Sequence, residues 1–160
     1  MAAPQVRARG WCSLLLVALA MLANAPAQEP AATVAGTKRV EIDKTRQMLR
    51  AYEDDRLVFQ SRISTGKWDK STPNGHFAAG EKHRFHYSQR YHNAPMPFSV
   101  QVNGHVFIHG FTQVPAWPAS HGCIRLPLDR ENPAEWFFHW VEPGTPIEVS
   151  GSWEKPKPQK

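Results

Sequence analysis

Short runs of alternating apolar and polar residues recur along this chain from residue 38 onward. Alternation with a period of two is typical of a half-buried β-strand, whose successive side chains point to opposite faces of a sheet. Two connections predict hairpins: the polar turn Glu53–Arg56 and the dipeptide Asn103-Gly104, which is the strongest short hairpin signal. The pattern as a whole predicts extended segments at 38–43, 45–52, 57–64, 76–79, 98–102, 105–109 and 145–149.

One segment near the C-terminus has a helical pattern instead. Asn132 and Pro133 are residue types preferred at a helix N-cap and first position, and Glu135 stands where the acid of a capping box belongs. Pro143-Gly144 then ends the helix. These elements predict a mainly β fold, a single domain over residues 38–150 with one short helix. The apolar face of that helix is expected to be Trp136, Phe137, Trp140 and Val141.

A long polar stretch, 81–97, separates two of the predicted strands and contains Phe85, Tyr87 and Tyr91 among its polar residues. Loops of this length inside a single domain often act as lids or as walls of a binding site. We therefore expect this stretch to be a functional loop.

The first 27 residues have the pattern of a secretory signal peptide. Arg7 and Arg9 precede the apolar run 11–23, and Ala25-Pro26-Ala27 is a small-x-small cleavage site. The apolar run is shorter than the about 20 residues that span a membrane comfortably. An uncleaved N-terminal anchor is the alternative interpretation.

Export changes how the cysteines are interpreted. Cys12 belongs to the leader, so Cys123 is the one cysteine of the mature chain. A single cysteine cannot form an internal disulfide, which leaves a reactive thiol or an intermolecular bond. Residues 28–37 are expected to be a flexible linker and residues 151–160 a disordered tail. No membrane span is expected in the mature chain.

Composition and charge narrow the function classes. The chain has 160 residues, 41% of them hydrophobic, which is enough for one core. The net charge of +5 falls to about +3 without the two arginines of the leader. Because the basic residues are scattered, we expect no nucleic-acid partner, although a mild basic bias suits an anionic polymer. A Gly-rich phosphate loop and a dithiol redox motif are both absent from the sequence.

Cys123 is the candidate nucleophile, although an isolated cysteine is commonly a small core residue. A thiol requires a nearby base to become the nucleophilic thiolate, and two histidines are candidates for that base. His109 lies fourteen residues upstream at a predicted strand end, and His121 lies two residues before the cysteine. The carbonyl of Gly110 is free to accept the second imidazole N–H of His109, which would fix the tautomer.

The residues around Cys123 suit an acyl-transfer site. In an extended segment His121 and Arg125 would share the face of Cys123. The planar guanidinium of Arg125 suits a substrate carboxylate, with an ordinary surface arginine as the alternative. The backbone N–H groups of Gly122 and Cys123 are candidates for an oxyanion hole. A zinc site is an alternative that uses His105, His109, His121 and Cys123, but their spacing is not one of the usual zinc patterns.

These residues resemble the signature of the L,D-transpeptidases with a YkuD-type catalytic domain. That signature is His-Gly, a gap, then Ser-His-Gly-Cys followed by a hydrophobic residue and Arg or Asn. It is matched here by His109-Gly110 and by the run Ser120–Arg125. The resemblance covers roughly 38–149. Other segments that resemble the family, in the family's order, are Ile42–Gln47, Tyr52-Glu53, Ser64–Lys67, Thr72–Phe77 and Ala94–Phe98.

The resemblance implies a β-sandwich-like catalytic domain with little helix. It implies that Cys123 is the nucleophile, that His109 is its general base, and that Gly110 orients His109 through its carbonyl. The residues that it implies for substrate binding are Ser120, His121, Gly122 and Arg125.

The implied activity is that of an exported cysteine acyl-transferase in the periplasm or cell envelope. It would form or exchange L,D (3→3) peptide links on peptidoglycan stem peptides through a Cys123 thioester. One alternative is a peptidoglycan hydrolase, an amidase or endopeptidase, with the same Cys/His site. Another is a non-catalytic cell-wall-binding module. We expect no cofactor, no bound metal and a monomer.

Overall fold

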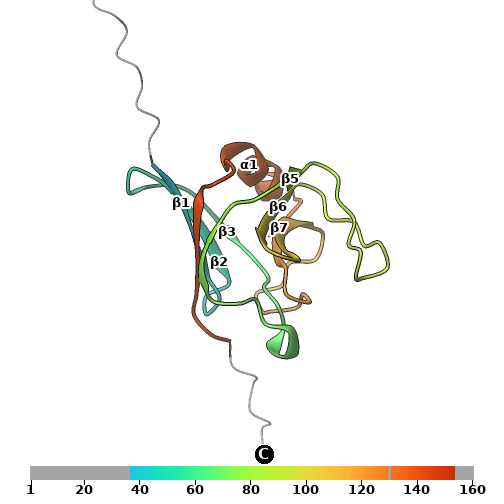
Figure 1. The fold of residues 1–160 in the computed structure, drawn as a ribbon. Coiled ribbons are helices and arrows are strands. Elements are labelled where there is room, and N and C mark those ends of the chain that lie inside the picture. The colour runs from blue at the N-terminus through green and yellow to red at the C-terminus, as the bar shows by residue number, and fades with distance from the viewer. Residues whose placement is uncertain (1–36, 130, 154–160) are drawn as a thin grey trace, which may run out of the picture. The chain divides into compact units, whose positions relative to one another are not determined.

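The computed structural model describes residues 37–129 and 131–153. The predicted signal peptide 1–27, nearly all of the predicted linker and most of the predicted tail lie outside the described residues. Two β-sheets and one α-helix make up the described part, with the longer sheet on the left of Figure 1 and the helix at the top. This arrangement confirms the predicted mainly β fold with one short helix.

The first sheet has five strands in the order β3-β2-β1-β9-β4. All neighbours are antiparallel except β1 and β9, which pair in parallel although they lie at opposite ends of the domain's sequence. This pairing joins the first and last strands of the domain. The strands are β1 (Lys38–Asp43), β2 (Met48–Glu53), β3 (Arg56–Arg62), β4 (Gly75–Ala78) and β9 (Pro146–Ser150).

The second sheet has four strands in the order β5-β6-β7-β8. Its β7 and β8 pair in parallel, with Ile108 opposite Ile124 and His109 opposite Arg125. A parallel pair cannot be closed by a tight turn and requires a long crossover. Residues 112–123 form that crossover. The strands are β5 (Lys82–His83), β6 (Ser99–Asn103), β7 (Val106–Phe111) and β8 (Ile124–Pro127).

The core lies where the two sheets and the helix meet. Alternate residues of the strands supply it, as the period-two pattern predicts. Helix α1 (Pro133–Trp140) adds Ala134 and Phe137, and Val141 at its C-cap completes that contribution. The largest fully buried strand side chains are Val40, Ile42, Leu49, Val100, Ile108, Ile124, Leu126 and Ile147.

Local signals placed the hairpins and the helix correctly. Asp54 and Asp55 both have positive φ in the β2–β3 turn, a conformation that Asp tolerates, and Gly104 has φ +52° in the β6–β7 turn. Asn132 caps α1 by accepting a hydrogen bond from the N–H of Glu135 at 3.3 Å. The predicted apolar face is only partly buried, because Trp136 is exposed and stacks on Phe59.

Two predicted strand boundaries were wrong. The first three residues of the segment predicted as a strand at 45–52 belong to a turn that ends at Gln47, and β2 begins only at Met48. Gln47 has φ +52° and its amide is held by backbone and side-chain groups of Lys44 and Thr65. The hydrogen bonds between Gln47 and the distant Thr65 thus favour a turn where the local alternation of apolar and polar residues predicts a strand. The strand predicted at 57–64 likewise ends at Arg62.

A short 3-10 turn, η1 (Trp68–Lys70), follows β3 and lies at the bottom of Figure 1. The chain between β5 and β6 forms the long loop on the right of the same view. No helix within residues 37–129 and 131–153 is long and apolar enough to cross a membrane.

The position of Phe137 generates a stability prediction. Phe137 is fully buried at the centre of the α1 contact, so Phe137→Ala should lower the free energy of unfolding by about 3–5 kcal/mol. The exposed His139 of the same helix is the matched control, and His139→Ala should change stability by no more than about 0.5 kcal/mol. Urea unfolding of both variants measures the difference. Equal losses of stability in the two variants would mean that the buried face of α1 has been assigned incorrectly.

Candidate active site

The parallel β7–β8 pair brings His109 and Cys123 to one place. His109 lies within β7, and Cys123 immediately precedes β8, beside Phe107 in the register that pairs Ile108 with Ile124. The crossover between the two strands therefore brings Cys123 back beside β7, the strand that carries His109. Both side chains line the same cavity, which has a volume of about 480 Å³.

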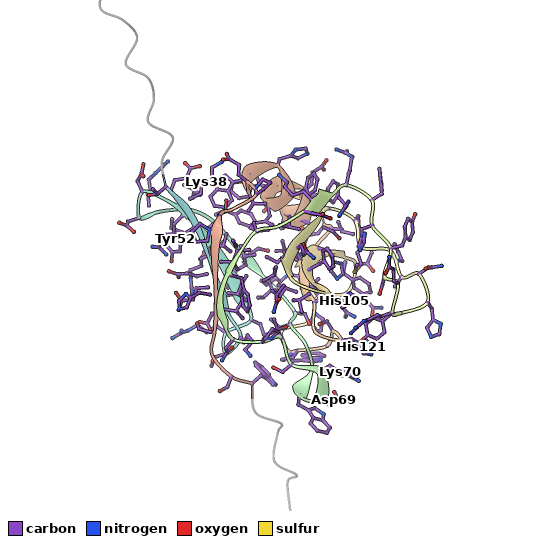
Figure 2. All side chains as sticks on the ribbon, viewed as in Figure 1. Lys38, Tyr52, Asp69, Lys70, His105 and His121 are labelled. Carbon is purple, nitrogen blue, oxygen red and sulfur yellow. The ribbon has the colours of Figure 1, made fainter. Side chains whose placement is uncertain are left out.

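Most of the predicted site residues gather at this cavity. Figure 2 shows His105 and His121 on the same side of the domain, with Lys70 of η1 next along that side. Gly110 lies behind the cavity and does not line it. The predicted residues that line it are His109, Ser120, His121, Gly122, Cys123 and Arg125.

His109 is deeply buried, with 4% of its surface exposed. Its Nδ1 lies 2.9 Å from the carbonyl oxygen of Gly110. Because a carbonyl only accepts, Nδ1 carries the proton and Nε2 of the neutral ring has a free lone pair. Burial lowers the pKa of His109 from 6.5 to about 4, with smaller contributions from the charges of Arg125 and His86, while the Gly110 hydrogen bond opposes the shift. The ring is therefore a neutral base at neutral pH.

Close packing explains why position 110 is a glycine. A Cβ on Gly110 would lie 2.5 Å from Cδ2 of Leu128 and 3.1 Å from the Cβ of Ala134 in α1. These distances are shorter than van der Waals contact. The residue that bonds His109 therefore also allows the helix to pack closely on β7.

Cys123 is partly exposed at the cavity and forms no disulfide. Its Sγ lies 3.6 Å from the carbonyl oxygen of His105. Burial raises the pKa of the thiol. The backbone N–H of Phe107 and the charge of Arg125 favour the thiolate and so offset part of this increase. The resting pair is therefore a neutral thiol and a neutral imidazole, so the thiol proton has to be transferred to a base when the sulfur reacts.

The segment 121–123 is a bend, which corrects the expectation that His121, Cys123 and Arg125 alternate along an extended strand. Gly122 has φ +122°, a conformation that L side chains rarely adopt. Ser120, with 2% of its surface exposed, holds the bend: its Oγ accepts from the N–H of Gly122 at 3.1 Å and donates to the carbonyl oxygen of Cys123. The Ser120 hydroxyl is thus engaged within the turn, and so is the N–H of Gly122, one of the two predicted oxyanion donors.

Arg125 and His121 are each held by an aromatic ring. The guanidinium carbon of Arg125 lies 4.1 Å from the centre of the Phe111 ring, which is a cation–π contact across the parallel pair. The ring of His121 stacks on Tyr91, with 4.5 Å between the centroids. Arg125 is therefore a cation of fixed position that lines the cavity, and His121 is an exposed residue that also lines it.

The loop predicted to be functional contributes several residues to the cavity that were not predicted as site residues, among them His86 and Tyr91. His86 packs against Phe107 at 4.9 Å and His83 at 5.1 Å, and burial together with His83 lowers the pKa of His86. The loop length was the available signal, but nothing local showed which side chains turn inward. Within residues 37–129 and 131–153, no three His, Cys, Asp or Glu side chains are grouped so as to hold a metal ion.

Comparison with known proteins gives a consistent result. Residues 37–149 match the family described as the L,D-transpeptidase catalytic domain, YkuD. Among solved structures, an L,D-transpeptidase from Stackebrandtia nassauensis is 25% identical with a TM-score of 0.65, over 72% of this chain and 56% of that one. One from Xylanimonas cellulosilytica is 27% identical with a TM-score of 0.63, over 76% and 64%.

A third structure, L,D-transpeptidase 1 from Mycobacterium tuberculosis, is 26% identical with a TM-score of 0.61, over 72% of this chain and 62% of that one. The present chain thus corresponds to less than two thirds of the length of each of these three structures. A search of curated proteins found no match.

The raised pKa of the thiol predicts the pH profile of alkylation. Iodoacetamide reacts with the thiolate, so the rate for Cys123 should keep rising with pH and show no plateau below about pH 9. Both measurements use the Cys12→Ser chain, in which Cys123 is the one thiol. The control is this chain unfolded in urea, whose alkylation rate should level off just above the ordinary thiol pKa of about 8.5. A plateau near neutral pH in the folded protein would mean a resting thiolate.

The lowered pKa of His109 predicts how stability depends on pH. Between about pH 6.5 and 4 the unfolded chain binds a proton at His109 that the folded chain does not, so stability falls as pH falls through this window. The loss attributable to His109 is at most about 3 kcal/mol. His109→Asn, which keeps a donor for Gly110, should remove that part of the slope in urea unfolding at several pH values. Parallel curves for the two proteins would contradict the assignment.

Proposed function

The chain belongs to the L,D-transpeptidase (YkuD) family, and from that membership we propose that it is a cysteine acyl-transferase acting on peptidoglycan stem peptides. The observation that carries the proposal is the shared cavity of Cys123 and a neutral, buried His109. A nucleophile beside a base whose tautomer is fixed is the minimum requirement for acyl transfer through a thioester.

In the first step Sγ of Cys123 attacks the carbonyl carbon of the third, diamino-acid residue of a stem peptide. Nε2 of His109 takes the thiol proton as the C–S bond forms. The tetrahedral intermediate collapses, the bond to D-alanine breaks, and His109 returns the proton to the departing amine. The products are a thioester on Cys123 and free D-alanine.

In the second step an amine attacks the thioester carbonyl, and His109 takes a proton from that amine. The C–S bond breaks, and the sulfur regains a proton as Cys123 is released. An amine of a second stem peptide gives a 3→3 cross-link, and a free D-amino acid gives an exchanged stem. The acceptor therefore decides the product, while Cys123 and His109 perform the same chemistry in each case.

The other cavity residues suit substrate binding. Arg125, a cation of fixed position, would bind a substrate carboxylate, and the N–H of Cys123 would serve as an oxyanion donor. His121, which stacks on Tyr91 and lines the cavity, would contact the substrate. Ser120 would contribute through the turn that it holds. No cofactor is required for either step.

We further propose that the protein is exported and acts as a monomer in the periplasm or cell envelope. Peptidoglycan lies outside the cytoplasmic membrane, and the signal-peptide pattern of residues 1–27 agrees with that location. The one cysteine of the mature chain is compatible with an oxidising compartment, because it leaves no partner for a wrong internal disulfide.

The test is incubation with purified disaccharide-tetrapeptide, followed by mass analysis of the products. The wild-type chain should release D-alanine and form dimers, and Cys123→Ala should lose at least about 1,000-fold in rate while keeping its fold by circular dichroism, because no nucleophile remains. The surface variant His139→Ala should keep wild-type activity. Release of D-alanine by Cys123→Ala would overturn the proposal. If the products were shortened disaccharide-peptide monomers without dimers, the protein would be a hydrolase that uses the same site.

A further inference from the structure

Two segments that resemble the family in sequence, 64–67 and 72–77, have no part in the chemistry described above. Both lie against the bend of residues 120–123, called the cysteine turn from here on. Gly66 forms an isolated β-bridge with Ser120, and the N–H of Lys67 donates to the carbonyl oxygen of Ser120 at 3.1 Å. Figure 2 shows the 3-10 turn between the two segments, marked by Asp69 and Lys70, beside His121.

Thr72 links these segments to the turn through one hydroxyl group. The residue is buried, with 1% of its surface exposed. Its Oγ1 accepts a hydrogen bond from the N–H of Gly66 at 2.9 Å and lies 2.8 Å from the carbonyl oxygen of Gly122. A carbonyl can only accept, so the hydroxyl proton of Thr72 points at Gly122. The direction of both bonds is therefore fixed.

The carbonyl of Gly122 and the N–H of Cys123 belong to the same peptide unit. That unit is planar and trans, so the two groups point in opposite directions. Holding the carbonyl against Thr72 therefore turns the N–H of Cys123 away from the buried side. In residues 37–129 and 131–153 this N–H has no protein acceptor, whereas the neighbouring Gly122 N–H is bound to Ser120.

The surroundings leave this peptide little freedom. A Cβ on Gly66 would lie 2.8 Å from the Cα of Gly122 and 2.1 Å from the carbonyl oxygen of Lys70, so the two glycines pack backbone against backbone. Lys44, itself buried, donates from Nζ to the carbonyl oxygen of Thr72 at 2.7 Å and so fixes Thr72 from behind. Thr72 thus joins the β1–β2 turn, through Lys44, to the Gly122–Cys123 peptide.

We propose that Thr72 is a positioning residue that orients the Gly122–Cys123 peptide so that the N–H of Cys123 faces the reacting carbonyl. The catalytic consequence rests on the proposed acyl transfer, but the orientation itself does not. Preorganised donors act on the charge that develops in the transition state, so their loss lowers kcat and leaves substrate binding largely intact. A second effect points the same way, because a hydrogen bond to the carbonyl of a peptide strengthens its N–H as a donor.

The first experiment tests the orientation without any activity. Thr72→Val keeps the shape and removes the hydroxyl, and Thr72→Ser keeps the hydroxyl. In NMR spectra of the full-length chain, Thr72→Val should shift the carbonyl 13C of Gly122 and the amide 15N of Cys123, and Thr72→Ser should leave both near their wild-type positions. Unchanged resonances in a folded Thr72→Val protein would overturn the proposal.

The second experiment tests the catalytic consequence with two reagents. Release of D-alanine from disaccharide-tetrapeptide requires the oxyanion donor, whereas alkylation by iodoacetamide requires only the thiolate. Thr72→Val should lose roughly 10- to 100-fold in kcat with KM nearly unchanged, because part of one oxyanion contact is lost. Its alkylation rate should stay within about threefold of wild type, and Thr72→Ser should restore kcat.

A parallel fall in alkylation and D-alanine release would overturn the proposal, since it would mean general loosening of the site. Failure of the proposed function has a different signature. The wild-type chain would then release no D-alanine, while the NMR shifts of Thr72→Val would still appear and would support the orientation.

Discussion

The parallel pairing of β7 with β8 is the constraint on which the site depends. It requires a crossover, and the crossover of residues 112–123 returns the chain so that Cys123 immediately precedes β8, the strand that pairs with the one carrying His109. The same register sets Arg125 opposite His109. A hairpin would have sent the second strand back in the opposite direction, with a different set of neighbours. The strand topology thus determines which side chains meet at the site.

The cysteine turn is held on both sides by groups that do no chemistry. Ser120 binds it from within, and Thr72, supported by Lys44, binds it from the loop between η1 and β4. Each of these bonds uses a buried polar group, and a buried polar group left without its partner costs about 1–3 kcal/mol. The turn therefore has one favoured conformation. Stability of the fold and geometry of the site rest on the same hydrogen bonds, which makes the two difficult to alter separately.

Much of the fold could be predicted because its signals are local. Asn103-Gly104 and the Asn132 cap depend only on neighbouring residues, and the structure contains both. The turn through Gln47 could not be predicted, because the buried bonds of its side chain reach Thr65, which is distant in sequence. The pairing of Cys123 with His109 was expected from the position of His109 at a strand end and from the resemblance to the L,D-transpeptidase signature, and both residues line one cavity. The contribution of Tyr91 to that cavity depends on tertiary contacts that the loop sequence does not reveal.

Burial of the Cys123–His109 pair also bears on how the sulfur survives between substrates. Peroxides oxidise the thiolate far more readily than the thiol, and further oxidation of a sulfenic acid is irreversible. The sequence from residue 37 onward contains no second cysteine that could rescue an oxidised Cys123 by forming a disulfide. A sulfur that keeps its proton at rest is thus shielded from damage that this domain has no means of reversing.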